Sequence, residues 1–364
     1  MIINEKFNKI WLLSDLHFGI YHNDKDWLKI QKDYFFDFFI PMIERTKDQR
    51  QMLLVLGDVF DNRRLLDIDI ISTVYDIFKK LGEILPVFII VGNHDTYKKG
   101  DNDINSLTIF KEIKNVNVYS KPDILTVNNK NLLLCPWITD KEEEKEVFKK
   151  YIKNYKCEYV FAHTEFNGMS LNSDNSISNS GLDISDFKNV KIISGHIHSS
   201  SSKETVLYTG SPYSMTRIDI NTDKKLFYIE TETDNWVIKE TINNFSPKFL
   251  KLNFNDIMEM DSEEFIKIIK NNFVDIVIDN SKIDIFLTAM KFFPDVFKDA
   301  RKVSIKNEDI NGRSDISLIV DEETNQDNNI TFLFNQYINK LPEKDKIPYI
   351  LNEIDEIRKE IEEE

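Results

Sequence analysis

The sequence predicts an α/β protein built as a layered sandwich, and two observations carry this prediction. Seven short apolar runs, rich in Val, Ile, Leu and Phe, recur through the first two-thirds of the 364 residues, as expected of strands buried on both faces. Amphipathic stretches of helix length lie between several of these runs, and strand alternating with helix is typical of layered α/β folds. The predicted strands are residues 9–13, 52–56, 86–91, 131–135, 158–162, 190–194 and 205–209.

Two helices are predicted between the early strands, at residues 26–45 and 65–81, because apolar side chains recur there at helical spacing. Further along the chain, residues 225–242 have the pattern of a β-hairpin. The apolar positions that define the two helices are Trp27, Ile30, Tyr34, Phe35 and Phe38 in the first, and Leu66, Ile70, Val74, Ile77 and Phe78 in the second.

The chain changes character near residue 245, where we expect a domain boundary. Residues 1–245 would form the main domain, and residues 246–315, which mix helices with short strands, would form a smaller α/β domain. Residues 316–329 are polar and predict a linker. Residues 330–364 carry an apolar stripe at helical spacing and predict a helical tail.

Composition bears on partners and location. The net charge is −15, whereas a protein that grips DNA alone usually has a basic face. If nucleic acid is the substrate, cations and a partner must therefore supply positive charge. Cys135 and Cys157 lie in or near apolar runs, which predicts buried thiols in a reducing compartment. We find no signal-peptide pattern and no apolar stretch of roughly 20 residues that could span a bilayer, so we expect a cytoplasmic protein without membrane contact.

Polar side chains gather where the predicted strands end. Five of the six histidines follow directly on a predicted strand, and in open α/β sheets this edge is where ligands bind. Histidines scattered by chance over a surface would not collect there. The donors at these strand ends are Asp15, His17, Asp58, Asn93, His163, His196 and His198.

The chemistry of this set predicts a centre with two metal ions. Carboxylate, amide and imidazole donors together suit Mn²⁺, Fe²⁺ or Zn²⁺ better than Ca²⁺ or Cu⁺. Two ions with four protein donors each need seven donors if a carboxylate is shared, and the set has that size. Two ions roughly 3.5–4 Å apart can clamp an in-line displacement at phosphorus. Gly57, Gly92 and Gly195 each precede a donor and leave room for a sharp backbone turn.

The motifs D-x-H, G-D-x-x-D, G-N-H-D, a lone His and G-H-x-H occur in this order across residues 9–215. This set resembles the calcineurin-like metallophosphoesterase superfamily. A narrower resemblance, carried by SDLHFG, GDVFDNR, VGNHD, GHIHSS and YTGSPYSMT, is to the SbcD-type nucleases of DNA double-strand-break repair, and most closely to the recombination endonuclease small subunit of large tailed bacteriophages. The fold that this resemblance implies is a layered β-sandwich flanked by helices, with a smaller α/β capping domain and a helical tail.

The resemblance also implies a role for each donor. One ion would be held by Asp15, His17, Asp58 and His198. The other would be held by Asp58, Asn93, His163 and His196, so that Asp58 bridges the two. Mn²⁺ is the expected metal, and it would supply an activated water for attack on the phosphodiester. His94 would stabilise the transition state and protonate the leaving oxygen.

Asp61 departs from the pattern, because the cellular repair nucleases usually carry His at this place and the related serine/threonine phosphatases carry Asp. We therefore expect a hydrogen bond between Asp61 and His94, in which the carboxylate would raise the pKa of His94. The alternative is that Asp61 caps the helix at 65–81. Arg63 and Arg64 follow and could contact substrate phosphate, and a surface salt bridge is the alternative for them.

Three other residues are ambiguous from sequence. We expect His22 in a solvated loop and Asp95 as a residue that shapes its loop. Trp137, which follows Pro136 at a strand end, is either a core residue or part of the cleft lining.

The function implied is a DNA nuclease, exonucleolytic on duplex ends and endonucleolytic on single strands, in recombination and double-strand-break repair. The implied assembly is a homodimer with a coiled-coil ATPase of the SMC-like, SbcC type. Residues 65–81 and 104–114 are the candidate dimer helices, and the tail at 330–364 would bind the ATPase or pack on its own domain. A phage-encoded protein of this kind would act in the host cytoplasm.

Two competing functions remain. A metallophosphatase or small-molecule phosphodiesterase would use the same metals, but it needs no appendage such as residues 250–364. A DNA-end scaffold without catalysis would not need all seven donors and His94.

Overall fold

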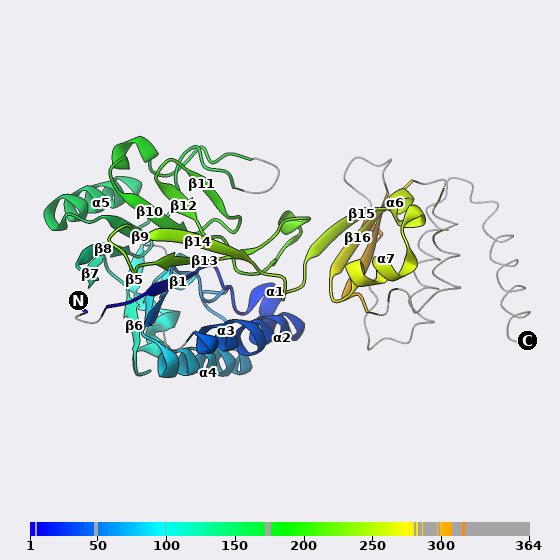
Figure 1. Cartoon of the computed structure of the whole chain (residues 1–364), viewed down its shortest axis with the longest axis horizontal. Coiled ribbons are helices and arrows are strands. Elements are labelled where there is room, and N and C mark those ends of the chain that lie inside the picture. Colours follow the sequence, from blue (N-terminus) through cyan, green and yellow to red (C-terminus); the bar gives the residue numbers. More distant parts are fainter. Residues whose placement is uncertain are drawn as a thin grey trace, which may run out of the picture. The chain divides into compact units, whose positions relative to one another are not determined.

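The computed structural model describes residues 1–3, 6–46, 50–98, 100–171 and 176–279, together with residues 282, 286, 297, 299–307 and 315–316. The chain divides into two compact units, Met1–Lys248 and a second unit that begins at Phe249 (Figure 1). The predicted tail at 330–364, and all but the first residue of the predicted linker at 316–329, lie outside the described residues.

Two six-stranded sheets form the centre of the first unit. In spatial order the first sheet consists of β14 (Val237–Ile242), β13 (Lys225–Glu230), β1 (Lys9–Leu13), β2 (Gln51–Val55), β3 (Val87–Ile90) and β6 (Val116–Tyr119). The second consists of β11 (Ser201–Lys203), β12 (Val206–Tyr208), β10 (Lys191–Gly195), β9 (Tyr159–His163), β8 (Lys130–Cys135) and β7 (Asp123–Val127). A small hairpin, β4 (Thr96–Lys98) and β5 (Asp101–Asn105), follows β3.

The central strands of both sheets are parallel. In the first sheet β1 pairs with β2 and β2 with β3, and in the second β8 pairs with β9 and β9 with β10. The register places Leu13 opposite Val55, and Gly195 opposite His163. Because parallel strands end at the same edge of a sheet, the loops that follow them come together.

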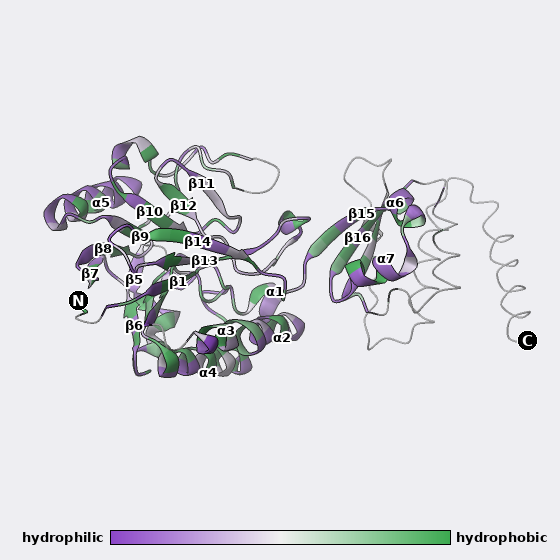
Figure 2. Ribbon diagram, in the orientation of Figure 1, coloured by the Kyte–Doolittle hydropathy of each residue, from purple (hydrophilic) through white to green (hydrophobic). Residues whose placement is uncertain are grey.

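Apolar side chains from both sheets pack against each other and form the main core. A second core lies between the second sheet and α5 (Lys141–Tyr155). Burial on both faces explains why the strands read as continuous apolar runs in the sequence, and Figure 2 shows the hydrophobic residues concentrated in the strands while α5 is mostly hydrophilic. Representative residues of the main core are Ile10, Leu54, Phe88, Leu132, Phe161 and Ile193.

The helices form the outer layers. Figure 1 shows α2 (Lys25–Asp33), α3 (Ile40–Arg45) and α4 (Ile68–Ile84) on one side of the sheets and α5 on the other. The predicted helix at 26–45 consists of α2 and α3 joined by a π-helical turn at Tyr34–Phe39. Pro41 lies just after this turn, and since proline has no N–H group the regular helical bonding cannot pass through it. The result is the predicted layered sandwich flanked by helices.

The segment 104–114 differs from the predicted dimer helix. It contains the end of β5 and a short 3₁₀ helix at Ser106–Phe110. Phe110 is fully buried, and its ring centroid lies 4.6 Å from that of Phe78 in α4. The apolar residues of this segment therefore mostly serve the core, and only Ile104 and Ile109 are exposed.

The second unit is a small α/β layer with its own core. In spatial order its sheet consists of β15 (Phe249–Asn253), β16 (Phe273–Ile278), β17 (Lys302–Asn307) and β18 (Asp315–Ile316), of which the first three are parallel. The helices α6 (Phe254–Glu259) and α7 (Ser262–Ile269) connect β15 to β16. Its core includes Phe265, Val274, Ile276, Phe297 and Val303.

Two expectations from composition can be compared with the structure. Among the described residues, no helix combines the length and the apolar character that crossing a membrane requires. Cys135 and Cys157 are free thiols and both are buried, as predicted.

Candidate metal centre

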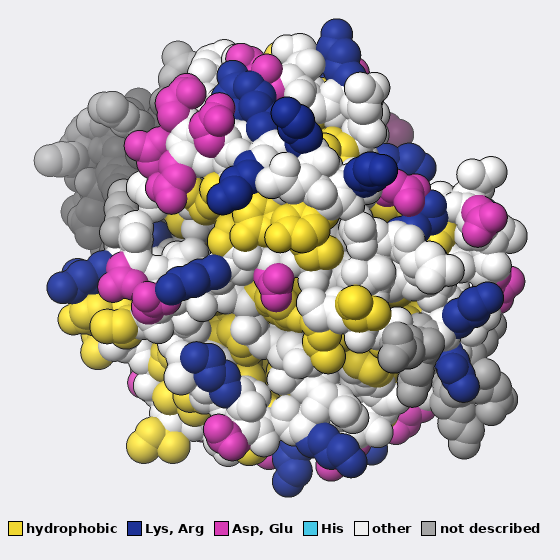
Figure 3. Space-filling model, turned by 90° about the vertical axis from the view of Figure 1, so that its left-hand side faces the viewer, with side chains coloured by type: hydrophobic (Ala, Val, Ile, Leu, Met, Phe, Trp, Pro, Cys, Tyr) yellow, Lys and Arg dark blue, Asp and Glu magenta, His cyan; other side chains and the backbone are white. Residues whose placement is uncertain are grey.

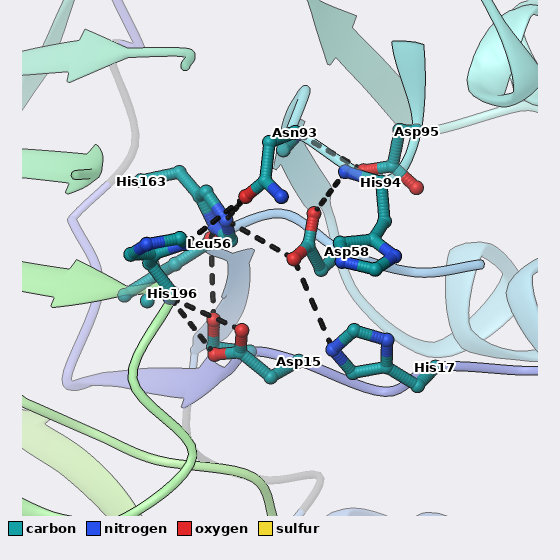
Figure 4. Close-up of polar contacts among 12 residues, drawn as sticks. Asp15, His17, Leu56, Asp58, Asn93, His94, Asp95, His163 and His196 are labelled. Atoms are coloured by element: carbon teal, nitrogen blue, oxygen red, sulfur yellow. Dashed lines mark hydrogen bonds and ion pairs between the residues drawn. The ribbon is translucent and has the colours of Figure 1, made fainter. Parts of the chain in front are cut away.

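The predicted donors meet where the central strands end (Figure 4). Three groups of described side chains bring their ligand atoms within 4.8 Å of one another, and two of them consist only of predicted donors. The first of these two is Asp15, His17 and His198, and the second is Asp58, His163 and His196. The remaining group is His17, Asp61 and His94. The structure therefore assembles, from five separate loops and strand ends, the side chains that the sequence predicted to meet.

The backbone at this edge is tightly turned. Asp15, His17, Asp58 and His196 all adopt positive φ angles, between 46° and 87°, which is costly for residues other than glycine and typical of functional sites. Two of these turns are hydrogen-bonded to each other, since Leu16 N–H and His17 N–H both donate to the carbonyl of Asp58, at 2.8 and 3.1 Å.

The predicted role of the glycines agrees with the space around them. A Cβ atom on Gly92 would lie 2.2 Å from Asp58 Oδ1, and one on Gly195 would lie 2.0 Å from Ser14 Oγ. Both glycines are therefore required by close approach of neighbouring groups, and any side chain there would displace a donor loop.

His17 presents an unused nitrogen to the centre. Its Nδ1–H donates to Asp61 Oδ1 at 3.0 Å, while its Nε2 atom is buried without a hydrogen-bond partner. This Nε2 lies 3.8 Å from Asp58 Oδ2. A buried ring nitrogen without a hydrogen-bond partner is costly, and a cation between His17 and Asp58 would bind the lone pair that this nitrogen has once it is deprotonated.

The expected contact between the Asp61 carboxylate and His94 is not the one that forms. His94 Nδ1–H donates to the backbone carbonyl of Asp61 at 2.7 Å, and the carboxylate bonds to His17 instead. The N–H of Asp61 donates to Phe18 O at 2.9 Å, which holds Asp61 beside the loop that carries His17. Nor does Asp61 cap the helix, since α4 begins at Ile68 after Asp67.

In the second group, ligand atoms also face one another. His163 Nδ1–H donates to Leu56 O at 2.7 Å, so its Nε2 faces Asn93 Oδ1 at 2.8 Å and Asp58 Oδ2 at 3.2 Å. Asn93 Oδ1 also lies 3.0 Å from His196 Nδ1. Acceptor atoms converge from four side chains, which requires either protons or a cation between them, so the residues fit a divalent metal.

Protonation in the metal-free protein follows from burial and charge. Burial lowers the pKa of His198 to about 2 and that of His196 to about 4, so both imidazoles are neutral and can donate lone pairs at neutral pH. Burial also opposes the charged form of His163, but the carboxylate of Asp58 raises its pKa to about 9. Burial likewise opposes ionisation of Asp58, yet the charges of His163 and His17 lower its pKa below the ordinary value.

His94 lies beside the donors and is tied to one of them. Its backbone N–H donates to Asp58 Oδ1 at 2.8 Å, and its ring lies 4.8 Å from the ring of His17. Since Nδ1 is used by the carbonyl of Asp61, Nε2 is the nitrogen left for a substrate.

Asp95 shapes the loops, as predicted. Its buried carboxylate accepts hydrogen bonds from the backbone N–H groups of Val59, Phe60 and Gly92, at 2.9 to 3.1 Å. It thus joins the loop after β2 to the loop after β3, which carry Asp58 and Asn93.

The position of Trp137 decides between a core residue and a residue that lines the cleft. Its ring centroid lies 4.9 Å from that of His196 and 6.0 Å from that of His163, and the side chain is only partly buried. Trp137 therefore lines the candidate metal centre.

The remaining candidates lie at the surface. Arg64 is exposed and its guanidinium lies 5.8 Å from the ring centroid of Tyr97. Within the described part of the chain, neither Arg63 nor Arg64 forms a salt bridge. His22 is exposed, in a short left-handed turn with Tyr21 and Asn23.

Supporting residues behind the donors were missed by sequence reasoning. The buried side chains of Gln31, Tyr213 and Lys224 donate to backbone carbonyls of the donor loops. Gln31 gave a weak signal, as a polar residue within an amphipathic helix. Nothing in the local sequence distinguishes Lys224 from Lys225.

The sequence around these donors matches a known protein family. The sequence profile of the calcineurin-like phosphoesterases matches residues 8–200, which is more than half of the chain. The chain belongs to the calcineurin-like phosphoesterase family. The resemblance drawn from the motifs is thereby confirmed, and the seven predicted donors lie within the matched residues.

Viral proteins are among its curated relatives. The phosphoesterase is 29% identical over 231 residues to exonuclease subunit 1 of Enterobacteria phage T4, a match that covers 62% of this chain and 66% of the relative. It is 24% identical over 211 residues to putative phosphoesterase 244L of Invertebrate iridescent virus 6, covering 56% of this chain and 69% of the relative. The match to the phage subunit thus spans slightly less than two-thirds of that protein's length.

Solved structures with a similar fold are more distant. Vps29 from Entamoeba histolytica, complexed with zinc, is 16% identical with a TM-score of 0.31, and the match covers 65% of this chain and 94% of Vps29. A 5′-nucleotidase precursor from Thermus thermophilus is 11% identical with a TM-score of 0.34, covering 66% of this chain and 55% of the nucleotidase.

Proposed function

We propose that this phosphoesterase is a DNA nuclease that depends on two divalent metal ions, exonucleolytic on duplex ends and endonucleolytic on single strands, and that it acts in recombination and double-strand-break repair. One observation carries the proposal. Asp58 Oδ2 lies 3.8 Å from His17 Nε2 and 3.2 Å from His163 Nε2, so a single carboxylate oxygen faces both donor groups. The similarity to a phage exonuclease subunit supports DNA as the substrate.

The proposed ligand sets keep the assignment made from sequence. One ion is held by Asp15, His17, Asp58 and His198. The other is held by Asp58, Asn93, His163 and His196. Bound there, two ions such as Mn²⁺ would supply an activated water and neutralise charge that develops on the phosphate.

The chain itself supplies proton transfer and orientation. In its doubly protonated form His94 gives the proton on Nε2 to the leaving oxygen, while its Nδ1–H stays bonded to the carbonyl of Asp61, which orients the ring. Asp61 acts through His17, whose proton it holds on Nδ1 so that Nε2 stays available to the ion. Trp137 covers one side of the centre, and Arg63 and Arg64 contact substrate phosphate away from the metals.

The proposed partners follow from surface and charge. Leu65, three residues before α4, is 70% exposed, Ile68 at the start of α4 is 84% exposed, and Ile104 is 62% exposed. These side chains support a homodimer contact through the α4 region. On the face drawn in Figure 3 acidic and basic side chains are mixed. Because the net charge of the chain is −15, metal ions and a coiled-coil ATPase of the SbcC type would supply much of the affinity for DNA.

The second unit and the C-terminal residues complete the proposal. The α/β unit at 246–315 would act as a capping domain that recognises DNA, and the segment 330–364 would bind the ATPase through a linker at 316–329. We also propose that the protein acts in the cytoplasm.

The rival function is a metallophosphatase or small-molecule phosphodiesterase, because the same centre would cleave such esters. The test compares Mn²⁺-dependent cleavage of linear duplex and single-stranded oligonucleotides with hydrolysis of p-nitrophenyl phosphate, with and without the ATPase. A nuclease degrades DNA and leaves the monoester nearly untouched. Rapid monoester hydrolysis without DNA cleavage would establish the phosphatase, and DNA-end binding without any hydrolysis would establish a scaffold.

A further inference from the structure

We propose that Lys224 is a positioning residue for one of the two metal ions, the one on the side of His17 and His198, and that the other ion does not depend on it. This inference rests on the proposed dinuclear centre. In this view, each half of the centre is held in place by its own set of residues, which contact the metal ligands but do not bind metal themselves.

Lys224 is a buried lysine whose donors all have partners. Its side chain is 5% exposed, and Nζ donates to His198 O at 2.9 Å and to Ser211 Oγ at 3.0 Å. It also forms an ion pair with the buried carboxylate of Asp219. A buried ammonium is retained only where such bonds compensate for its lost hydration, so the carbonyl of His198 is part of what holds Lys224 in place.

The carbonyl of His198 accepts hydrogen bonds from more than one group. Besides Lys224 Nζ–H, it accepts the backbone N–H of Ser211 at 3.0 Å. Ser211 Oγ lies 3.3 Å from it and 3.0 Å from the carbonyl of Tyr213, so its one proton is shared between these two acceptors. A Cβ atom on Gly210, whose φ is +70°, would lie 2.7 Å from the same carbonyl oxygen. The backbone of His198 is therefore held in place against residues 210–211, and this restricts the orientation of its imidazole.

Asp219 links Lys224 to the rest of the segment 208–224. Its Oδ2 accepts the N–H groups of Met215 and Thr216, at 2.9 and 3.1 Å, while its other oxygen pairs with Lys224. The ion pair thus closes the loop between β12 and β13 into a fixed shape.

The same loop supports His17, the other imidazole on this side. Tyr213 O–H donates to Leu16 O at 2.6 Å, and Gln31 Nε2–H donates to the carbonyls of Leu16 and His17, at 2.8 and 3.1 Å. Gln31 Nε2 also lies 3.2 Å from Tyr213 Oη. Both imidazoles of one half of the centre are therefore held from residues 210–224 and from α2.

The other half is held differently. His163 bonds to Leu56 O through Nδ1, and the ring of His196 packs on Trp137. The loop that carries Asn93 is fixed by Asp95. None of these contacts passes through Lys224 or Asp219, so removal of Lys224 should leave this half in place.

The test titrates full-length wild type and Lys224→Met with Mn²⁺ by calorimetry and counts ions per chain. We expect wild type to bind two ions, and Lys224→Met to bind one ion as wild type does while the other binds about 10–100-fold more weakly, the usual effect of losing a residue that orients a metal ligand. Lys225→Met is the matched control, because Lys225 is the adjacent residue and pairs with exposed Glu240 at 2.7 Å. It should bind both ions normally.

A second pair of variants separates positioning from folding. Lys224→Met leaves Asp219 buried without its partner, which destabilises the fold, so Asp219→Asn combined with Lys224→Met removes both charges. If Lys224 acts on His198, the double variant still binds one ion weakly. If Lys224 only neutralises Asp219, the double variant regains normal binding of both ions, and the proposal is overturned.

The identity of the affected ion is tested in a His17→Ala background. That variant should retain only the ion near His163, and adding Lys224→Met should not weaken it further. Equal weakening of both ions, or normal binding by Lys224→Met, overturns the inference. Failure of wild type to bind two ions instead overturns the dinuclear centre itself, so the two outcomes are distinct.

Discussion

Asp61 Oδ1 accepts a hydrogen bond from His17 Nδ1–H at 3.0 Å, although the motif in which it lies led us to expect His94 as its partner. The contact decides which nitrogen of His17 carries the proton. Because Nδ1 is the donor, Nε2 is free to face Asp58, and this is the arrangement in which carboxylates support metal-binding histidines.

We expect Asp61→Ala to weaken metal binding by about 10–100-fold, because His17 would lose the partner that sets its tautomer and ring orientation. Mn²⁺ titration of the purified variant measures this change. Asp61→Asn keeps an oxygen that can accept from Nδ1–H, so its loss should be smaller. If Asp61 acted through His94 instead, Asp61→Ala would bind metal normally and lose only turnover.

We expect His94→Gln to keep both ions and to lose about 10²–10⁴-fold in kcat on DNA, the usual contribution of a positioned acid. His94 contacts Asp58 only through its backbone N–H, which the substitution retains. The loss should be much smaller with bis(p-nitrophenyl) phosphate, whose leaving group needs little protonation. An equal loss on both substrates would contradict the role of a general acid.

Metal affinity should rise with pH up to about pH 9. The pKa of His163 is raised to about 9 by Asp58 against the effect of burial, so an ion must displace that proton, and affinity should increase by about tenfold per pH unit below this value. Calorimetry in buffers of different ionisation enthalpy should detect release of at least one proton per chain at pH 7.5. Binding without proton release would show that His163 is neutral in the metal-free protein.

The same shift predicts an opposite trend for the stability of the metal-free protein. The pKa of His163 in the folded protein, about 9, lies above the 6.5 that is usual for a histidine. Its contribution to stability is therefore fully present below pH 6.5 and is lost as pH rises toward 9. Thermal unfolding with a chelator should show a falling Tm across this window, and a His163→Gln variant should lack this decline.

Gly92→Ala should abolish binding of both ions, because its Cβ atom would lie 2.2 Å from Oδ1 of the bridging Asp58. Metal analysis of the purified variant is the measurement. Gly100→Ala is a suitable control, since its Cβ would meet only Thr139 Oγ1 at 4.0 Å. The control carries a strain of roughly 1 kcal/mol from its positive φ and should bind metal normally.

Much of the fold was predictable because its central strands are buried on both faces and so appear in the sequence as short, continuous apolar runs. All seven predicted strands are present, and each observed end lies within one residue of the predicted end. The predicted hairpin at 225–242 forms β13 and β14. The segment 104–114 was harder, because its apolar residues have a spacing that suits a helix, whereas Phe110 is drawn into the core by Phe78.

The sequence by itself determined which side chains gather at the strand ends, because parallel strands deliver the residues that follow them to one edge. Only the tertiary structure decided what those side chains touch. Asp61 lies three residues from Asp58, but its partner is set by the loop that crosses beside it from β1. Lys224 and Gln31 reach the centre from distant parts of the chain, and no local pattern records such contacts.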